Sequence, residues 1–333
     1  DVLDWPDPDE SEPTSAVVPE AGWVRESTGR PSDGPGYEDA IGMIFQCRPR
    51  GGFSHSYRAE NDFVWYAFGQ ALSAGGGGPA YPDPLSRHSI SHNVVLIDGV
   101  GQQWDPWRPK RPFVGRLLAY QRKPDYVHWV GDATYAYQSV EGLLRCHRHV
   151  VFLEDRWFIL FDDLAMLPDA KPARFSWLYH VAPECDLEID PVAGTLQYRM
   201  GNVDALVALA DADSLEIVNQ TGRDGFRNPI TGEDHFEKTT SALARTGRKL
   251  SEKQWMAHNV WVTNRRPART QCFLAVLAAG RNGDPLPKIE FSSGRAVSIK
   301  PPDGRQRTVS FDRNMPGDVR IEVEAVRQHA LET

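Results

Sequence analysis

The chain has 333 residues, 41% of them hydrophobic and 25% charged, which is enough for a large core and excludes a wholly disordered protein. Its formal net charge of −8 argues against nucleic acid or an anionic membrane as the main partner. No run of about 18 apolar residues predicts a membrane span, and four scattered cysteines without a CxxC pair exclude a zinc ribbon and argue against a disulfide framework.

The first residues differ in composition from the rest. Residues 1–20, "DVLDWPDPDESEPTSAVVPE", are rich in Pro, Asp, Glu and Ser, which predicts a linker or surface arm rather than a core element. We place the linker at residues 1–21. From Trp23 onward, short apolar runs such as "AIGMIFQCR" and "DFVWYAFG" alternate with turns.

The next runs predict strands with definite faces. "HNVVLIDG" (92–99) is a compact strand that ends at an Asp-Gly turn, and "HVVFLEDRWFILFDDL" (149–164) predicts a hairpin joined at Glu-Asp. In "RFSWLYHV", Phe175, Trp177 and Tyr179 alternate with other residues, so one face is aromatic. Further candidate strands are "TLQYRM", "ALVALA", "LEIVN", "HNVWVTN", "QCFLAVLAAG", "KIEFS", "AVSIK", "RTVSF" and "VRIEVEAV".

Strands that recur about every ten residues with little helix between them are typical of an antiparallel β-sandwich. We therefore predict an all-β chain. The sandwich would occupy residues 22–260, with a loop-rich insertion at 219–255 that carries a short helix, and a smaller C-terminal β-sheet region would occupy residues 261–333.

Candidate chemistry is concentrated at histidines beside polar clusters. There is no Gly-rich phosphate loop after a strand, no HExxH and no GxSxG elbow. His147 and His149 in "RCHRH" would share one face of a strand, either as structural residues or as a metal pair, but two ligands are too few for a metal site. His55, Asp62 and nearby serines could be drawn as a triad, yet no motif orders them.

Residues 50–103 carry a more specific pattern. "GGFSHSYRAENDFVWYAFGQAL" is followed by "SRHSISHNVVLIDGVGQ", and later by "GDATYAYQ", "CHRHVVFLEDRWFILFDDL" and "RFSWLYHV". This order of motifs resembles the heparinase II/III-like polysaccharide lyases, above all the exo-type alginate lyases. The resemblance runs from about residue 22 to at least 183. It implies β-elimination on a uronic-acid glycan such as alginate.

The resemblance places His55 at the family's catalytic histidine, as a proton-transfer residue. Tyr57 stands where the family has a metal-binding histidine. It would either fill that space or present its hydroxyl to the substrate, which makes it the second catalytic candidate. The family's Asp after "AFG" falls in the "GGGG" run here, and only His92 of that set remains. We therefore predict that the metal site is lost and expect no cofactor.

Substrate-binding candidates follow from the same comparison. Arg58 and Arg87 could pair with a uronate, since a guanidinium matches a carboxylate, or lie on a solvated surface. Asn61 matches the family's asparagine, whose amide could hold the turn. His92 would order a loop or contact sugar. Trp104 would stack on a sugar ring or anchor a loop.

The family's N-terminal α/α toroid, which supplies part of the site, is missing from these residues, so we expect a toroid domain or partner chain to complete the enzyme. An acidic polysaccharide or oligosaccharide is the expected ligand, with no nucleic acid or membrane as partner. The alternative is a non-catalytic glycan-binding or scaffold module. The expected location is periplasmic or secreted, with the cytoplasm as the alternative.

Overall fold

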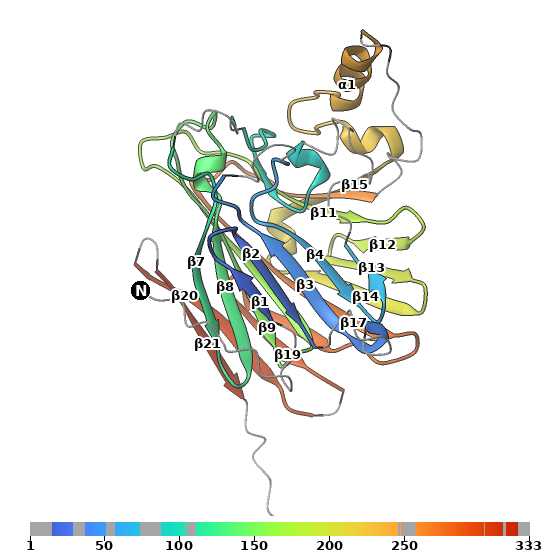
Figure 1. Ribbon diagram of the computed structural model, residues 1–333. Helices are drawn as coiled ribbons and strands as arrows, with labels where there is room; N and C mark the ends of the chain where they lie inside the picture. The colour runs from blue at the N-terminus through green and yellow to red at the C-terminus, as the bar shows by residue number, and fades with distance from the viewer. Residues whose placement is uncertain are drawn as a thin grey trace, which may run out of the picture.

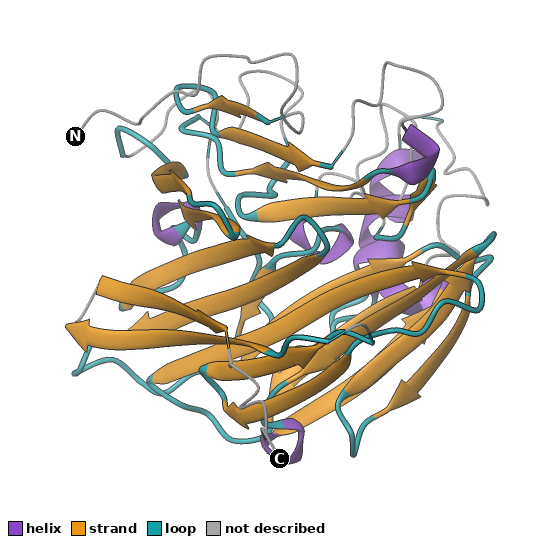
Figure 2. Cartoon of the chain, turned by 90° about the horizontal axis from the view of Figure 1, so that it is seen from below, coloured by secondary structure: helices purple, strands orange, loops and turns teal. Residues whose placement is uncertain are grey.

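The structure is a computed structural model that describes residues 15–28, 37–50, 57–73, 88–103, 105, 111–245, 247, 258–302, 304–315 and 318–325. Every strand pair in these ranges is antiparallel, and the strands form four sheets in stacked layers (Figures 1 and 2). The expected all-β antiparallel fold is confirmed. Helical residues among those described form α1 (His235–Ala244) and short 3-10 turns at the ends of the sheets.

The first sheet is a five-stranded meander in sequence order. Its strands are β1 (Ala16–Val18), β2 (Trp23–Ser27), β3 (Ile41–Gln46), β4 (Asp62–Ala67) and β5 (Gln70–Ala71). The last residues of the expected linker thus form β1, which pairs with β2 because alternation buries Val17 in the core and leaves its neighbours outside. Residues 1–14 lie outside the described part of the chain.

The second sheet has eight strands and is the main wall of the sandwich. In spatial order they are β12 (Asp186–Asp190), β13 (Thr195–Met200), β14 (Val203–Leu209), β17 (Thr270–Arg281), β10 (Trp157–Met166), β9 (Leu143–Leu153), β8 (Tyr126–Asp132) and β7 (Arg116–Arg122). The predicted hairpin is confirmed as β9–β10. Its turn residues Glu154 and Asp155 both have positive φ, at 48° and 53°, the geometry of a type I′ turn.

A four-stranded sheet lies beside the meander and faces the same core. Its spatial order is β15 (Leu215–Thr221), β16 (His258–Asn264), β11 (Phe175–Val181) and β6 (Val95–Ile97). The aromatic face predicted for β11 is confirmed, because Phe175, Trp177 and Tyr179 all lie in the core shared with the eight-stranded sheet.

Hydrogen bonds between aromatic side chains link the layers through that core. Trp65 Nε1 in β4 donates to the Tyr179 hydroxyl at 2.6 Å, and this hydroxyl lies 2.6 Å from that of Tyr198 in β13. Tyr198 in turn donates to the carbonyl of Leu72 at 2.6 Å. The chain of bonds satisfies buried polar groups and fixes how the meander sits on the eight-stranded sheet.

The fourth sheet covers the outer face of the eight-stranded sheet. It contains β18 (Lys288–Ser293), β19 (Ala296–Lys300), β20 (Arg307–Met315) and β21 (Asp318–Ala325). Val297, Ile299, Val309 and Phe311 pack against the outward side chains of β9, β10 and β17. Strand β17 lies in the region that the sequence analysis assigned to the C-terminal sheet, and β16 spans the predicted boundary at residue 260. Both pair within the sandwich sheets, and the C-terminal four-stranded sheet begins at Lys288.

The connection between β15 and β16 carries the helix expected in residues 219–255. It contains the 3-10 turn η6 (Gly222–Phe226) and α1, which projects beyond the sheets at the upper right of Figure 1. Phe226 and Phe236 pack with Leu178 and Trp261 on the outer face of the four-stranded sheet. Across the described residues, none of the helices has the length and apolar character needed to cross a membrane.

Candidate functional site

The predicted site residues divide into two groups. Tyr57, Arg58, Asn61 and His92 are described, whereas His55, Arg87 and Trp104 lie outside the described residues. The described four come from two segments, 57–63 before and at the start of β4, and 88–102 around the 3-10 turn η3 (Ser89–Ser91) and β6. The structure brings these two segments together at one end of the sandwich.

The first contact between the two segments involves the rings of Tyr57 and His92 and the carboxylate of Asp62. The ring of Tyr57 meets that of His92 edge-on, with centroids 5.7 Å apart. His92 Nδ1 lies 2.8 Å from the Asp62 carboxylate, which orients the imidazole. Burial acts to raise the pKa of Asp62, but the interactions with His92, the backbone N–H of Asn93 and His180 together outweigh it and lower that pKa. In the described part of the chain, the Tyr57 hydroxyl has no protein partner.

Asn93, the residue after His92, joins strand β4 to strand β11. Its backbone N–H donates to Asp62 at 2.9 Å, and its side-chain amide donates to the carbonyl of Phe63 at 2.8 Å. Its side-chain oxygen accepts from the backbone N–H of His180 in β11 at 2.8 Å. The "NDF" and "HN" motifs therefore bond to each other, which explains why these residue types stand at this spacing.

Arg148 in β9 holds both segments from the opposite wall of the sandwich. Its guanidinium is fully buried and makes two hydrogen bonds to Asp162, at 2.9 Å and 3.0 Å. It also donates to the carbonyl of Asn61 at 2.6 Å and to that of Asn93 at 2.5 Å. One buried cation with a paired carboxylate thus fixes the position of both motifs.

Asn61 makes the turn that leads into β4. It has φ 66°, a left-handed conformation that asparagine tolerates better than most residues. Its buried side-chain amide donates to the carbonyl of Cys146 at 3.2 Å, and its side-chain oxygen lies close to Gly131, where any Cβ would collide with it. Asn61 therefore holds the turn, as one reading of the sequence proposed, and its contact with substrate stays a prediction.

Glu60 and Gln102 close the frame behind the turn. The backbone N–H of Glu60 donates to the Gln102 side chain, which donates back to the Glu60 carbonyl, each at 2.7 Å. The buried Glu60 carboxylate pairs with Arg48 at 3.1 Å, and Arg48 also donates to the carbonyl of Tyr57 at 2.8 Å. Gln102 belongs to "DGVGQ", so this motif also serves to hold the 57–62 segment.

The described donor set does not fit a divalent metal ion. Asp62 and His92 bind each other, and Tyr57 packs on His92 where a further ligand would be needed. No group of three His, Cys, Asp or Glu side chains converges within the described ranges. The histidine pair of "RCHRH" faces the C-terminal sheet instead. There His149 stacks on His128 with a ring-centroid distance of 5.4 Å, and His147 lies 3.5 Å from Asp132.

Some supporting residues were missed by the sequence analysis, namely Arg148, Asp162 and His180. Each lies on a strand that the sequence predicted, and each is buried. For two of them the signal available was an arginine within the strand that became β9 and an aspartate in the apolar run that became β10, because such charges are rarely buried without a partner.

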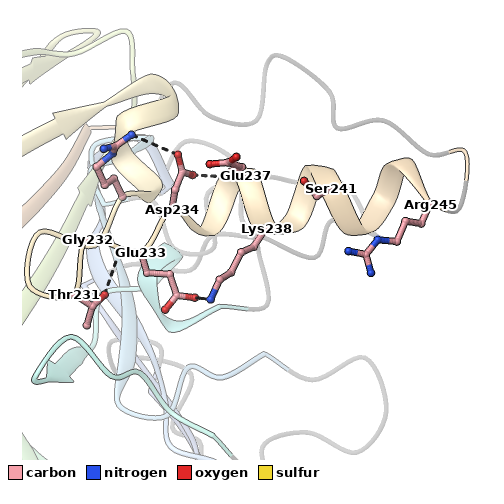
Figure 3. Close-up of a pocket in the computed structure, with 9 residues that line it drawn as sticks. Thr231, Gly232, Glu233, Asp234, Glu237, Lys238, Ser241 and Arg245 are labelled. Carbon is pink, nitrogen blue, oxygen red and sulfur yellow. Dashed lines mark hydrogen bonds and ion pairs between the residues drawn. The ribbon is translucent and has the colours of Figure 1, made fainter.

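An open groove of about 670 Å³ lies on the insertion (Figure 3). Its lining residues are Arg227, Thr231, Gly232, Glu233, Asp234, Glu237, Lys238, Ser241 and Arg245. The lining mixes both signs of charge, and Lys238 reaches back from α1 to form an ion pair with Glu233. This groove adjoins the 88–102 segment through His235, which lies 3.5 Å from Glu233 and packs against His88.

Comparisons with known proteins agree on the architecture. A family model described as heparinase II/III-like, C-terminal, matches residues 11–274. The structure of a heparan sulfate lyase HepC mutant from Pedobacter heparinus has 12% identity and a TM-score of 0.60, and the match covers 94% of this chain and 42% of that one. A heparinase III structure has 13% identity and a TM-score of 0.58, over 95% of this chain and 43% of that one.

At these identities the solved structures show a shared fold, and this chain spans less than half of their length. No curated protein matches the sequence.

Proposed function

The chain belongs to the heparinase II/III-like family, matched through the family's C-terminal domain, and we propose that it is the β-sandwich part of a polysaccharide lyase. The proposed substrate class is a uronic-acid-containing polysaccharide or oligosaccharide, cleaved by β-elimination. The remainder of the active site would be supplied by an α/α toroid, as a domain or partner chain beyond these residues. The proposed location is the periplasm or the cell exterior, where such glycans are met.

The proposed reaction defines what the residues must do. A base removes the proton from C5 of the uronate, the electron pair forms the C4–C5 double bond, and the C4–O4 bond breaks. A donor neutralises the adjacent carboxylate, and an acid protonates the departing O4 oxygen. We assign proton transfer to His55 and Tyr57. Arg58, Asn61, Arg87, His92 and Trp104 are the proposed sugar contacts.

One observation supports this proposal above the others: the two motif segments meet around Tyr57. Its ring rests on His92, which is held by Asp62, and its hydroxyl has no partner among the described residues. A half-buried phenol with a fixed ring and a hydroxyl that no described residue occupies suits proton transfer to a bound ligand. Arg148 and Asn93 fix the backbone around it, so little reorganisation is needed when substrate binds.

A non-catalytic glycan-binding or scaffold module is the second candidate. It is favoured by one observation: the motif residues Asn61, Asp62 and His92 are buried and bond to each other or to the strands around them. Such a module would bind acidic glycans or brace a toroid with no turnover.

The test is a lyase assay on this chain assembled with its toroid, as a longer gene product or a co-expressed chain. Alginate and heparan sulfate serve as substrates, and product is followed by the ultraviolet absorbance of the new double bond. We expect turnover of one of them, abolished by His55→Ala, while His258→Gln serves as the histidine control. Glycan binding without turnover in the assembled protein would favour the second candidate, and full activity of His55→Ala would reject the catalytic assignment.

A further inference from the structure

Two histidines from distant parts of the chain face each other beside the candidate site. His88 directly precedes η3, and His235 is the first residue of α1. Their ring centroids are 5.0 Å apart with planes inclined by 49°. His88 stands at the N-cap position of η3, but its side chain makes no capping hydrogen bond. The pair therefore joins the insertion to the motif segment that ends in His92.

Arg58 adds a guanidinium beside this pair, on the residue after Tyr57. Its side chain is half-buried, burial lowers the pKa of its guanidinium, and no carboxylate in the described residues forms an ion pair with it. The Ser89 hydroxyl donates to the Arg58 carbonyl at 2.7 Å, which ties Arg58 to the residue after His88. Burial, with the charges of His235 and Arg58, lowers the pKa of His88 to about 4.

The acids of the insertion are already engaged. Glu233 forms an ion pair with Lys238 and lies 3.5 Å from His235 (Figure 3 shows the Glu233–Lys238 pair). Asp234 lies 3.8 Å from Arg223 and 3.7 Å from Arg227. The described carboxylates near the two imidazoles, Glu233 and Asp234, thus already have cationic partners, whereas the guanidinium of Arg58 has no ion-pair partner among the described residues.

We propose that Arg58, His88 and His235 form a subsite for an acidic group, a carboxylate or sulfate, on the sugar next to the cleaved linkage. This rests on the proposed lyase function and adds a specificity determinant supplied by the β15–β16 insertion. The placement follows from the chain: Arg58 is adjacent to Tyr57, and His88 is separated from His92 only by η3. An oxyanion there meets a guanidinium and two imidazole N–H donors.

The subsite has a defined pH dependence. Burial lowers the pKa of both histidines, so they are neutral in the free protein near pH 7. A bound anion favours the imidazolium form, which means that binding takes up protons. Glu233, Asp234 and Lys238 are the charged groups that face the pair from the insertion, and Arg58 faces it from the other side. Affinity for an acidic glycan should therefore rise as the pH falls below neutrality.

Isothermal titration calorimetry of the full 333-residue chain tests the subsite without requiring turnover. The probes are an alginate tetrasaccharide, a heparan sulfate tetrasaccharide, a neutral cellotetraose and inorganic sulfate. We expect an acidic tetrasaccharide to bind and the neutral one to fail, with sulfate alone far weaker. His235→Gln and Arg58→Gln should each weaken binding roughly tenfold at pH 6. His235→Gln should also flatten the pH dependence, and His258→Gln should change neither.

Equal affinity of wild type, His235→Gln and Arg58→Gln would overturn the proposal, as would an equal loss in His258→Gln. If a variant unfolds, NMR spectroscopy of the wild-type protein tests the subsite instead, through the imidazole signals of His88 and His235. Both should shift toward the protonated form on adding the acidic tetrasaccharide, and unmoved signals at saturation would reject the subsite. Binding with these properties but no lyase activity in the assembled protein would refute the proposed function alone. Lyase activity with an unchanged KM in His235→Gln would refute the subsite alone.

Discussion

Asp62 and His92 are 30 positions apart in the sequence, and the structure places the carboxylate of one 2.8 Å from Nδ1 of the other. The same carboxylate accepts the backbone N–H of Asn93 at 2.9 Å. One side chain therefore sets both the imidazole orientation and the path of the chain that follows it. This contact is one of several direct hydrogen bonds between the two motif segments, alongside those of Glu60 with Gln102.

Replacing this carboxylate should uncouple the segments. Asp62→Asn keeps the shape but removes the charge, and its amide nitrogen or oxygen can match only one of the two donors. We expect a loss of about 1–3 kcal/mol of unfolding free energy, since a buried donor is left unsatisfied. Urea unfolding measures this loss. The exposed Asp190→Asn serves as control, and an unchanged midpoint in Asp62→Asn would show that the contact is not made in solution.

Among the residues of the site, Arg148 should be the one whose substitution destabilises the protein most. Arg148→Met leaves Asp162 buried without its partner and frees two carbonyls, so we expect about 3–5 kcal/mol of destabilisation. Arg148→Met combined with Asp162→Leu should recover part of this loss, because the unpaired charge is then removed as well. Chemical unfolding of both variants measures the difference. Arg199→Gln, which breaks the exposed pair with Asp204, should leave the unfolding midpoint unchanged.

Tyr57→Phe separates catalysis from folding. The ring can still pack on His92, and the hydroxyl has no partner in the described part of the chain, so stability should change by no more than about 0.5 kcal/mol. The proposed proton-transfer role predicts a fall in kcat of about 100-fold or more in the assembled lyase, with KM little changed. Tyr135→Phe is the matched control at an exposed tyrosine. Unaltered kcat in Tyr57→Phe would leave Tyr57 as a space-filling residue.

The buried histidines should make the protein sensitive to acid. Burial lowers the pKa of His128 to about 3 and that of His180 to about 4, from the ordinary value of 6.5. The unfolded chain thus takes up protons first as the pH falls. The stability that comes from keeping these two histidines neutral is fully present above about pH 6.5 and is lost progressively toward pH 4. Urea midpoints between pH 7.5 and 4.5 should fall, less steeply in His128→Gln than in His258→Gln. An equal pH dependence of the urea midpoint in the two variants would exclude His128 as a cause of the acid sensitivity.

The β9–β10 turn offers a stabilising change. Asp155 is exposed and has φ 53°, a conformation that costs an ordinary residue about 1 kcal/mol and glycine almost nothing. Asp155→Gly should therefore raise the unfolding free energy by about 0.5–1 kcal/mol, while Asp155→Val should lower it. Thermal melting of the two variants tests the sign. A lower melting temperature for Asp155→Gly would mean that the turn differs from the type I′ geometry.

Local pattern was sufficient to predict much of the sheet structure. Strict alternation in "RFSWLYHV" marks the aromatic face of β11, and the apolar runs around Glu154 and Asp155 mark the hairpin. The pattern did not predict β12, where a "DLEID" run alternates but carries three acidic residues, because this edge strand leaves one face to solvent. Nor did it predict β1, whose three residues follow an acidic, Pro-rich stretch.

The site was less accessible to sequence reasoning for a physical reason. The order of the motifs indicated Tyr57, Asn61 and His92 as candidates. The residue that bonds to both of their segments, however, is Arg148, which is 87 positions from Asn61 and 55 from Asn93. Alternation shows which face a side chain takes and not which distant carbonyl it meets. The contact between His88 and His235 was hidden for the same reason, since it depends on how the insertion folds back over the 88–102 segment.

The position of Arg148 also has a consequence for the order of assembly. The five-stranded meander pairs only strands that are neighbours in sequence, so it can form from local contacts, whereas Arg148 belongs to the opposite sheet. The turn at residues 57–62 can therefore reach its final shape only after the two sheets have docked. On refolding, glycan binding should return in the slow phase that reports sheet docking, later than the far-ultraviolet signal of strand formation.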